Sequence, residues 1–233
     1  RRRGWCAARP ALRADVARCT IVGMPRPIEA VIHAHALRQN LARAREAAPG
    51  SRVFAVIKAN AYGHGIECVY DALRSADAFA LLDISEAERM RALGWRGPIL
   101  LLEGIFTPAD TALLDQYSLN SAVHCIEQIA MLEQASFERP IDVHLKMNTG
   151  MNRLGFKPDQ FAGAWKRLRA IAAVREITLM THFANADSDD PADNQQLNGD
   201  LAGGGDVDGG FVLSPDSTRV VYVADQELDG HYE

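Results

Sequence analysis

Residues 53–66 read VFAVIKANAYGHGI, and this segment indicates the architecture of the chain. Its first five residues are apolar, as in a strand that is covered on both faces of a sheet. Gly63 and Gly65 end the extended run, and a helix is expected to begin near Ile66. Lys58 therefore stands at the carboxyl end of a buried strand, directly before a glycine-containing turn.

The same alternation of strands and helices continues on both sides of this segment. Short apolar runs predict strands over residues 28–32, 53–57, 78–82, 99–102, 119–123, 141–145 and 177–180. Helices are expected over 34–47, after a capping box at 85–88, and from a first turn that contains Pro108. Strands that alternate with helices pair in parallel through right-handed crossovers, so the sequence predicts a barrel or a doubly wound sheet.

Six of the predicted strands follow the first helix, whereas a TIM-type (β/α)8 barrel needs eight. The expected fold class of residues 24–192 is therefore α/β, a partial TIM-type barrel of about six strands. Residues 1–23 are expected to form an unstructured Arg-rich leader. Residues 193–233 are expected to form a Gly-rich linker and a short β-hairpin tail, with strands at 211–213 and 219–223.

The composition excludes several classes of protein. The apolar fraction of 48% and the charged fraction of 24% are ordinary for a globular protein, and no apolar stretch has the length of a membrane helix. A net charge of −5 argues against a nucleic-acid partner, although the first 23 residues hold six arginines and one aspartate. The four cysteines lie far apart, which indicates reduced thiols in the cytoplasm and no metal site.

Lys58 is the first residue with a clear chemical interpretation. The carboxyl end of a parallel strand is where barrel enzymes build their active sites. Partial shielding from water lets an amine lose its proton more readily, as a lysine that forms a Schiff base requires. The glycines allow a ligand to approach the backbone, and the helix start near Ile66 offers amides to an anion. A lysine considered alone is more often a solvated residue beside a turn.

Residues 55–65, AVIKANAYGHG, resemble the lysine motif of alanine racemases, enzymes that depend on pyridoxal 5'-phosphate (PLP). The resemblance covers about residues 24–192, roughly the first half of such an enzyme. It implies that Lys58 carries PLP as an internal aldimine and acts as one of two catalytic bases. It also implies that Tyr62 lies near the cofactor phosphate, and that the strand near Ile28 belongs with a C-terminal β domain.

Two further segments carry the same resemblance. Residues 146–155, KMNTGMNRLG, resemble the racemase segment in which an arginine contacts the phenolic oxygen of PLP and the substrate, and Arg153 matches that catalytic arginine. Lys146 matches a lysine that is often carbamylated in the family and pairs with the arginine. Residues 181–186, THFANA, place His182 at the position of a histidine that lies against the cofactor ring.

The resemblance implies a cytoplasmic isomerase that interconverts L- and D-alanine, supplies D-alanine for peptidoglycan, and forms a homodimer in the full-length family. Racemisation needs acid–base groups on both faces of the α-carbon, and the family takes the second from a tyrosine of the partner subunit's C-terminal domain. That tyrosine and the later phosphate-binding loops have no counterpart in this sequence. We therefore expect an incomplete racemase with little activity, and no nucleic-acid or membrane partner.

Three other interpretations share part of this pattern. A single-domain PLP-binding carrier of the homeostasis type would hold the cofactor on Lys58 without racemase activity. A basic-amino-acid decarboxylase or a broad-specificity racemase would use a similar barrel. The tail, in which residues 214–217 join the two predicted strands, weakly resembles half a blade of a TolB-type β-propeller, which implies a propeller-related interaction protein.

Overall fold

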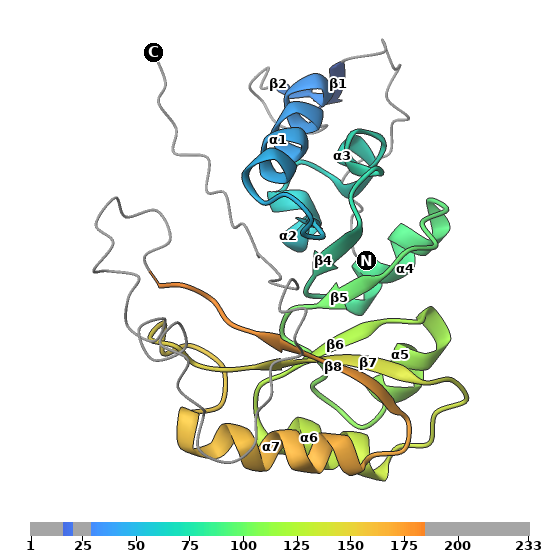
Figure 1. The fold of residues 1–233 in the computed structure, drawn as a ribbon. Helices are drawn as coiled ribbons and strands as arrows, with labels where there is room; N and C mark the ends of the chain where they lie inside the picture. The colour runs from blue at the N-terminus through green and yellow to red at the C-terminus, as the bar shows by residue number, and fades with distance from the viewer. Residues whose placement is uncertain (1–15, 21–28, 185–233) are drawn as a thin grey trace. The chain divides into compact units, whose positions relative to one another are not determined.

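The computed structural model describes residues 16–20 and 29–184 (Figure 1). The chain divides into two compact units, and their described parts are residues 16–20 with 29–97, and residues 98–184. The predicted linker and β-hairpin tail over 193–233 lie outside the described residues, and so does most of the predicted leader. No helix in the described ranges is long and apolar enough to cross a membrane.

Six strands form one parallel sheet, as the alternating pattern predicts. Their order follows the sequence, from β3 through β8. The strands are β3 (Phe54–Val56), β4 (Ala78–Leu81), β5 (Ile99–Leu101), β6 (Asn120–Val123), β7 (Ile141–Lys146) and β8 (Val174–Met180). The expected α/β fold is therefore confirmed, and its six sequential parallel strands are consistent with a partial TIM-type barrel.

The first unit also contains an antiparallel pair, β1 (Val16–Thr20) and β2 (Glu29–His33), which forms a separate two-stranded sheet. β1 lies inside the segment for which the sequence predicts an unstructured leader, and that prediction is wrong for these five residues. Pairing with β2 satisfies the backbone groups of an otherwise isolated segment. The position of β2 outside the parallel sheet agrees with its predicted separation from the barrel.

The helices of the first unit are α1 (Ala34–Ala47), α2 (Lys58–Tyr62), α3 (Ile66–Leu73) and α4 (Ile84–Ala92). α1 has the predicted bounds, and it packs beside α3 (Figure 1). All four residues of β4 are buried, and the ring of Phe79 meets that of Trp95 edge to face, with centroids 4.8 Å apart. This aromatic pair contributes to the core of the unit.

The capping box predicted at residues 85–88 is wrong. The N-cap of α4 is Asp83, whose side chain accepts a hydrogen bond from the Ser85 amide at 2.7 Å. Asp83 ranks with Ser85 as an N-cap residue, and local sequence alone does not choose between them. The consequence is that Glu86, and not Glu88, occupies the third position of the helix.

The second unit contains α5 (Asp110–Tyr117), α6 (Ile126–Gln134) and α7 (Pro158–Ala170) between its strands. Pro108 precedes α5 by two residues, so its predicted place in the first helical turn is also wrong. α6 and α7 pack side by side on one face of the sheet, and Arg167 of α7 pairs with Glu133 of α6 at 2.7 Å (Figure 1). β7 and β8 run parallel, with Lys146 opposite Met180.

Gly104, which follows β5 with φ of +73°, is a position where only glycine fits. A Cβ atom there would collide with the Ala122 carbonyl oxygen and lie 2.6 Å from Nε2 of Gln128. We expect Gly104→Ala to lower the free energy of unfolding by about 2–4 kcal/mol, because overpacking adds to backbone strain. Urea denaturation followed by circular dichroism measures the change.

Gly163 provides the matched control for this prediction. It lies in α7 and is exposed, and a Cβ atom added to it would have no neighbouring atom within 4 Å outside its own helix backbone. Gly163→Ala should raise the free energy of unfolding by about 0.5–1 kcal/mol, since alanine is the better helix former. Two substitutions with the same sign of effect would contradict this account of Gly104.

His144 of β7 predicts a pH dependence of stability. Burial lowers the pKa of His144 to about 4 from 6.5, although the nearby charge of Asp142 opposes the change. Between pH 6.5 and pH 4 the unfolded chain binds a proton that the folded chain does not, so stability falls as the pH falls. The loss due to this group is about 3 kcal/mol across that window.

The measurement is urea denaturation at about pH 7 and about pH 4.5, on either side of the titration of the unfolded histidine, for the wild type and for His144→Leu. The variant should lose less stability between the two pH values than the wild type does, because it cannot titrate at this position. His35→Gln, at an exposed histidine, is the control that should leave the difference unchanged. An identical loss in wild type and His144→Leu would show that another group carries the dependence.

Candidate functional site

Lys58 lies at the carboxyl end of β3, as predicted, with Ile57 between it and the last strand residue. The backbone amide of Ile57 donates a hydrogen bond to the Ala80 carbonyl oxygen at 2.9 Å, which continues the β3–β4 pairing up to the residue before the lysine. The side chain of Lys58 is half-buried. The sheet therefore determines the point at which the lysine leaves the strand.

The four residues after Lys58 form a left-handed turn within α2. Ala59, Asn60, Ala61 and Tyr62 have φ between 52° and 56°. The Ala61 amide donates to the Ile57 carbonyl oxygen and the Gly63 amide to that of Ala59, both at 2.9 Å. Left-handed helical geometry costs an L-residue roughly 1–2 kcal/mol, so a run of four needs support from elsewhere in the fold.

Gly63 and Gly65 continue the turn with φ of +85° and +92°, a region that glycine reaches without strain. α3 then starts at Ile66, where the sequence predicts a helix. The amide of Ile66 donates to Oδ1 of Asn60 at 3.2 Å. The chain itself therefore uses one amide of the anion site that is predicted at this helix start.

Tyr62 lies beside Lys58, so these two predicted residues are brought together. The Nζ atom of Lys58 is 5.6 Å from the centroid of the Tyr62 ring, within the range of a cation–π contact. The Tyr62 side chain is 42% exposed, an unusual state for a large aromatic residue. It leaves a phenol group accessible next to the lysine.

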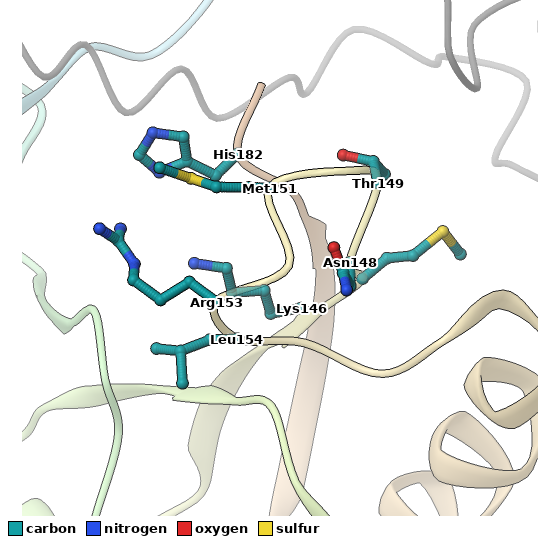
Figure 2. Close-up of a pocket in the computed structure, with 8 residues that line it drawn as sticks. Lys146, Asn148, Thr149, Met151, Arg153, Leu154 and His182 are labelled. Carbon is teal, nitrogen blue, oxygen red and sulfur yellow. The ribbon is translucent and has the colours of Figure 1, made fainter. Parts of the chain in front are cut away.

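The second unit brings three other predicted residues into one pocket. Lys146 at the end of β7, Arg153 in the following loop, and His182 just after β8 line it together with Met147, Asn148, Thr149, Met151 and Leu154. Figure 2 shows the side chains of Lys146 and Arg153 extending toward the same side, with His182 beyond them and Thr149 on the other side. Lys146 is only 5% exposed, whereas Arg153 is exposed.

The loop that carries Arg153 is closed by backbone and side-chain hydrogen bonds. Phe156 donates its amide to the Lys146 carbonyl oxygen and accepts from the Asn148 amide, both at 2.9 Å. Oδ1 of Asn148 accepts from the amides of Gly150 and Asn152 at 3.1 and 3.0 Å. These contacts make the loop a defined turn, and Arg153 therefore projects from a fixed position.

A pair of threonines joins this loop to the strand that carries His182. The hydroxyl oxygens of Thr149 and Thr181 are 2.5 Å apart, and the Thr181 hydroxyl also donates to the Met147 carbonyl oxygen at 3.3 Å. The pocket residues from β7 and from β8 are therefore connected, because Thr181 directly precedes His182.

The pocket has a basic character. Its eight lining residues in the described chain include Lys146, Arg153 and His182 but no carboxylate. The pKa of His124, at the end of β6, is lowered chiefly by burial and also by the positive charge of Lys146. A site of this kind favours an anionic group, and the guanidinium of Arg153 suits a phenolate or a carboxylate because its fork is planar.

Other residues of the site have no clear signal in the sequence. Glu86 and Arg89 of α4 reach Asn60 in the turn after Lys58, and Thr181 reaches Thr149. The partners are 26, 29 and 32 residues apart in the chain, so only the fold brings them together. Asn60 alone offers a hint, since asparagine tolerates left-handed backbone better than most residues.

The fold and these residues define a class of protein. It is a barrel-type α/β domain that has a lysine at the end of β3 and a basic pocket at the ends of β7 and β8. The family model described as "Alanine racemase, N-terminal domain" matches residues 32–199. The chain therefore belongs to the alanine racemase N-terminal domain family. The match ends before the predicted hairpin tail and lends no support to its propeller-like resemblance.

Curated relatives and solved structures point the same way. The chain is 56% identical over 172 residues to an alanine racemase of Paraburkholderia phytofirmans, covering 74% of this chain and 48% of the relative. It is 62% identical over 164 residues to one of Paracidovorax citrulli, covering 70% and 44%. The biosynthetic alanine racemase of Pseudomonas aeruginosa superposes with a TM-score of 0.68 at 40% identity, covering 72% and 48%. The chain spans about half the length of these relatives.

Ala59 offers a direct test of the left-handed turn. It is exposed and has φ of 52°, and glycine adopts this conformation without the steric cost that alanine bears. We expect Ala59→Gly to raise the free energy of unfolding by about 0.5–1 kcal/mol, after the added entropy of the unfolded chain is subtracted. Ala42→Gly, at an exposed position inside α1, should lower it by about 0.5–1 kcal/mol. Thermal or urea unfolding compares the pair, and destabilisation by both would argue against the turn.

Proposed function

We propose that this chain is the cofactor-binding part of a PLP-dependent alanine racemase. The observation that carries the proposal is the position of Lys58 at a strand end, beside an exposed Tyr62 and before a left-handed turn. The pocket of Lys146, Arg153 and His182 supports it independently. In this proposal the enzyme is cytoplasmic, acts on alanine, supplies D-alanine for peptidoglycan and works as a homodimer.

The charges and donors in each unit fit PLP. The cofactor has an aldehyde, an aromatic ring with a phenolic oxygen, and a phosphate group. Lys58 offers an amine and Tyr62 a phenol in the first unit, while the second unit offers a basic pocket whose described lining holds no carboxylate. A permanently charged guanidinium matches an anionic phenolic oxygen, and an imidazole offers a flat face to an aromatic ring.

Bound PLP would supply an electron sink that makes the α-proton of an amino acid acidic. In the proposed site Lys58 holds the cofactor through Nζ and moves the proton on one face of the α-carbon. By the resemblance, Tyr62 would serve the phosphate, Arg153 would serve the phenolic oxygen and the substrate, and His182 would serve the ring.

Lys146 has a supporting role in the proposal. Its side chain is shielded and lines the same pocket as Arg153. Both features favour carbamylation, in which the neutral amine adds CO2 and releases a proton. A carbamate on Lys146 would turn a repelling neighbour of Arg153 into an attracting one and so orient the guanidinium. The second face of the α-carbon needs another acid–base group, which the resemblance assigns to a tyrosine of the partner subunit's C-terminal domain.

The test is an absorption spectrum of the purified chain with added PLP, before and after borohydride, followed by peptide mass mapping. We expect a visible band that borohydride removes and a pyridoxyl group fixed on Lys58. Lys58→Ala should abolish both, because the substitution removes the amine at this strand end. Lys166→Ala, at an exposed lysine of α7, should behave as the wild type does. Equal labelling of wild type and Lys58→Ala would overturn the proposal.

Exchange of the α-proton of alanine in deuterated water then separates the enzyme from the PLP-binding carrier. A racemase site exchanges the proton on the face that Lys58 serves, whereas a carrier that only holds the cofactor does not. Cofactor fixed on Lys58 without any exchange would favour the carrier.

A further inference from the structure

Glu86 is a buried carboxylate that faces the turn after Lys58. The residue is 7% exposed, and its Oε1 atom accepts a hydrogen bond from the Asn60 amide at 2.5 Å. The other oxygen, Oε2, is buried and has no hydrogen-bond partner among the described residues. Burying a carboxyl oxygen without a hydrogen-bond partner is unfavourable, so the contact with Asn60 must offset this cost.

The position of Glu86 in α4 makes this contact more informative. Asp83 is the N-cap, so Glu86 is the third helical residue, where a glutamate commonly reaches back to the N-cap amide. Here the Glu86 carboxylate crosses to another element and accepts from Asn60. The helix end is capped by Asp83 through Ser85, which leaves Glu86 available for the turn.

Arg89, one helical turn further along α4, holds the side chain of the same asparagine. Its Nη2 atom donates to Oδ1 of Asn60 at 2.8 Å. Glu67 of α3 fixes Arg89 in return, through hydrogen bonds from Nε at 2.9 Å and from Nη2 at 2.5 Å. Backbone and side chain of Asn60 are therefore held by two residues of one rigid helix.

We infer that Glu86 is a positioning residue for Lys58, acting through the left-handed turn that its hydrogen bond to Asn60 holds; this inference rests on the proposed function of Lys58. The turn is costly for L-residues, and it relaxes toward ordinary backbone when its external hydrogen bonds are lost. Lys58 lies between two fixed points, because a hydrogen bond to Ala80 holds Ile57 and the turn holds Ala59. Relaxation of the turn therefore changes the backbone at Lys58 first. Glu86 does not touch the reacting atoms.

The test compares Glu86→Leu with Glu86→Gln in the full chain. Glutamine keeps an oxygen that can accept from Asn60, whereas leucine does not. Glu88→Leu, at an exposed glutamate of the same helix, is the matched control. Two readouts need no cofactor: hydrogen exchange of the Asn60 amide by NMR, and the rate at which formaldehyde and cyanoborohydride methylate Lys58, measured against Lys157 by peptide mass spectrometry.

Glu86→Leu should speed exchange of the Asn60 amide about tenfold, as expected for the loss of one hydrogen bond. It should change the methylation rate of Lys58 several-fold while leaving that of Lys157 unchanged. Glu86→Gln and Glu88→Leu should stay within about twofold of the wild type in both measurements. A lower melting temperature with unchanged Asn60 exchange and Lys58 reactivity would show a merely structural role and overturn the inference.

Glu86→Asp keeps the inference testable if the leucine variant does not fold. The shorter side chain retains a carboxyl group but draws the acceptor away from the Asn60 amide, so the same changes are expected at Asn60 and Lys58. Fixation of PLP by borohydride is measured last. A chain whose Lys58 responds to Glu86 but never binds PLP would refute the proposed function and leave the positioning role intact.

Discussion

Parallel strand pairing is the constraint on which both groups of site residues depend. In the first unit the β3–β4 register pairs Val56 with Ala80, and the Ile57 amide donates to the Ala80 carbonyl oxygen, so Lys58 leaves the sheet at a defined point. In the second unit the β7–β8 register sets Lys146 opposite Met180, and His182 follows two residues later. Because the carboxyl ends of parallel strands meet at one edge, residues from distant segments converge on each local site.

The turn after Lys58 is where this chain departs from the most stable local choice. Four consecutive L-residues are left-handed, and the buried Glu86 that supports them has an oxygen without a partner in the described chain. Such conflicts between local preference and fold are concentrated at functional sites, where neighbouring structure over-determines the conformation. The turn and its supporting network act together as one device that directs a lysine.

The two groups of residues differ in electrostatic character. The Lys58 amine lies beside an aromatic ring, and the turn that follows it contacts a glutamate and an arginine through Asn60, whereas Lys146, Arg153 and His182 form a basic pocket. Membership of the alanine racemase N-terminal domain family gives the proposal its substrate class.

Periodicity and short motifs were sufficient to predict the six parallel strands, the bounds of α1 and the helix start at Ile66, because these features depend on local residue order. The same reasoning selected Lys58, Tyr62, Lys146, Arg153 and His182, whose roles stay proposals. It missed β1, misplaced the cap of α4, and did not reveal the partners of Glu86 or Thr149. The contacts of Glu86 and Thr149 join residues 26 and 32 positions apart, and β1 is a strand only through its pairing with β2. The cap of α4 depends on which of two equivalent residues the packing selects, so only the tertiary structure decided these features.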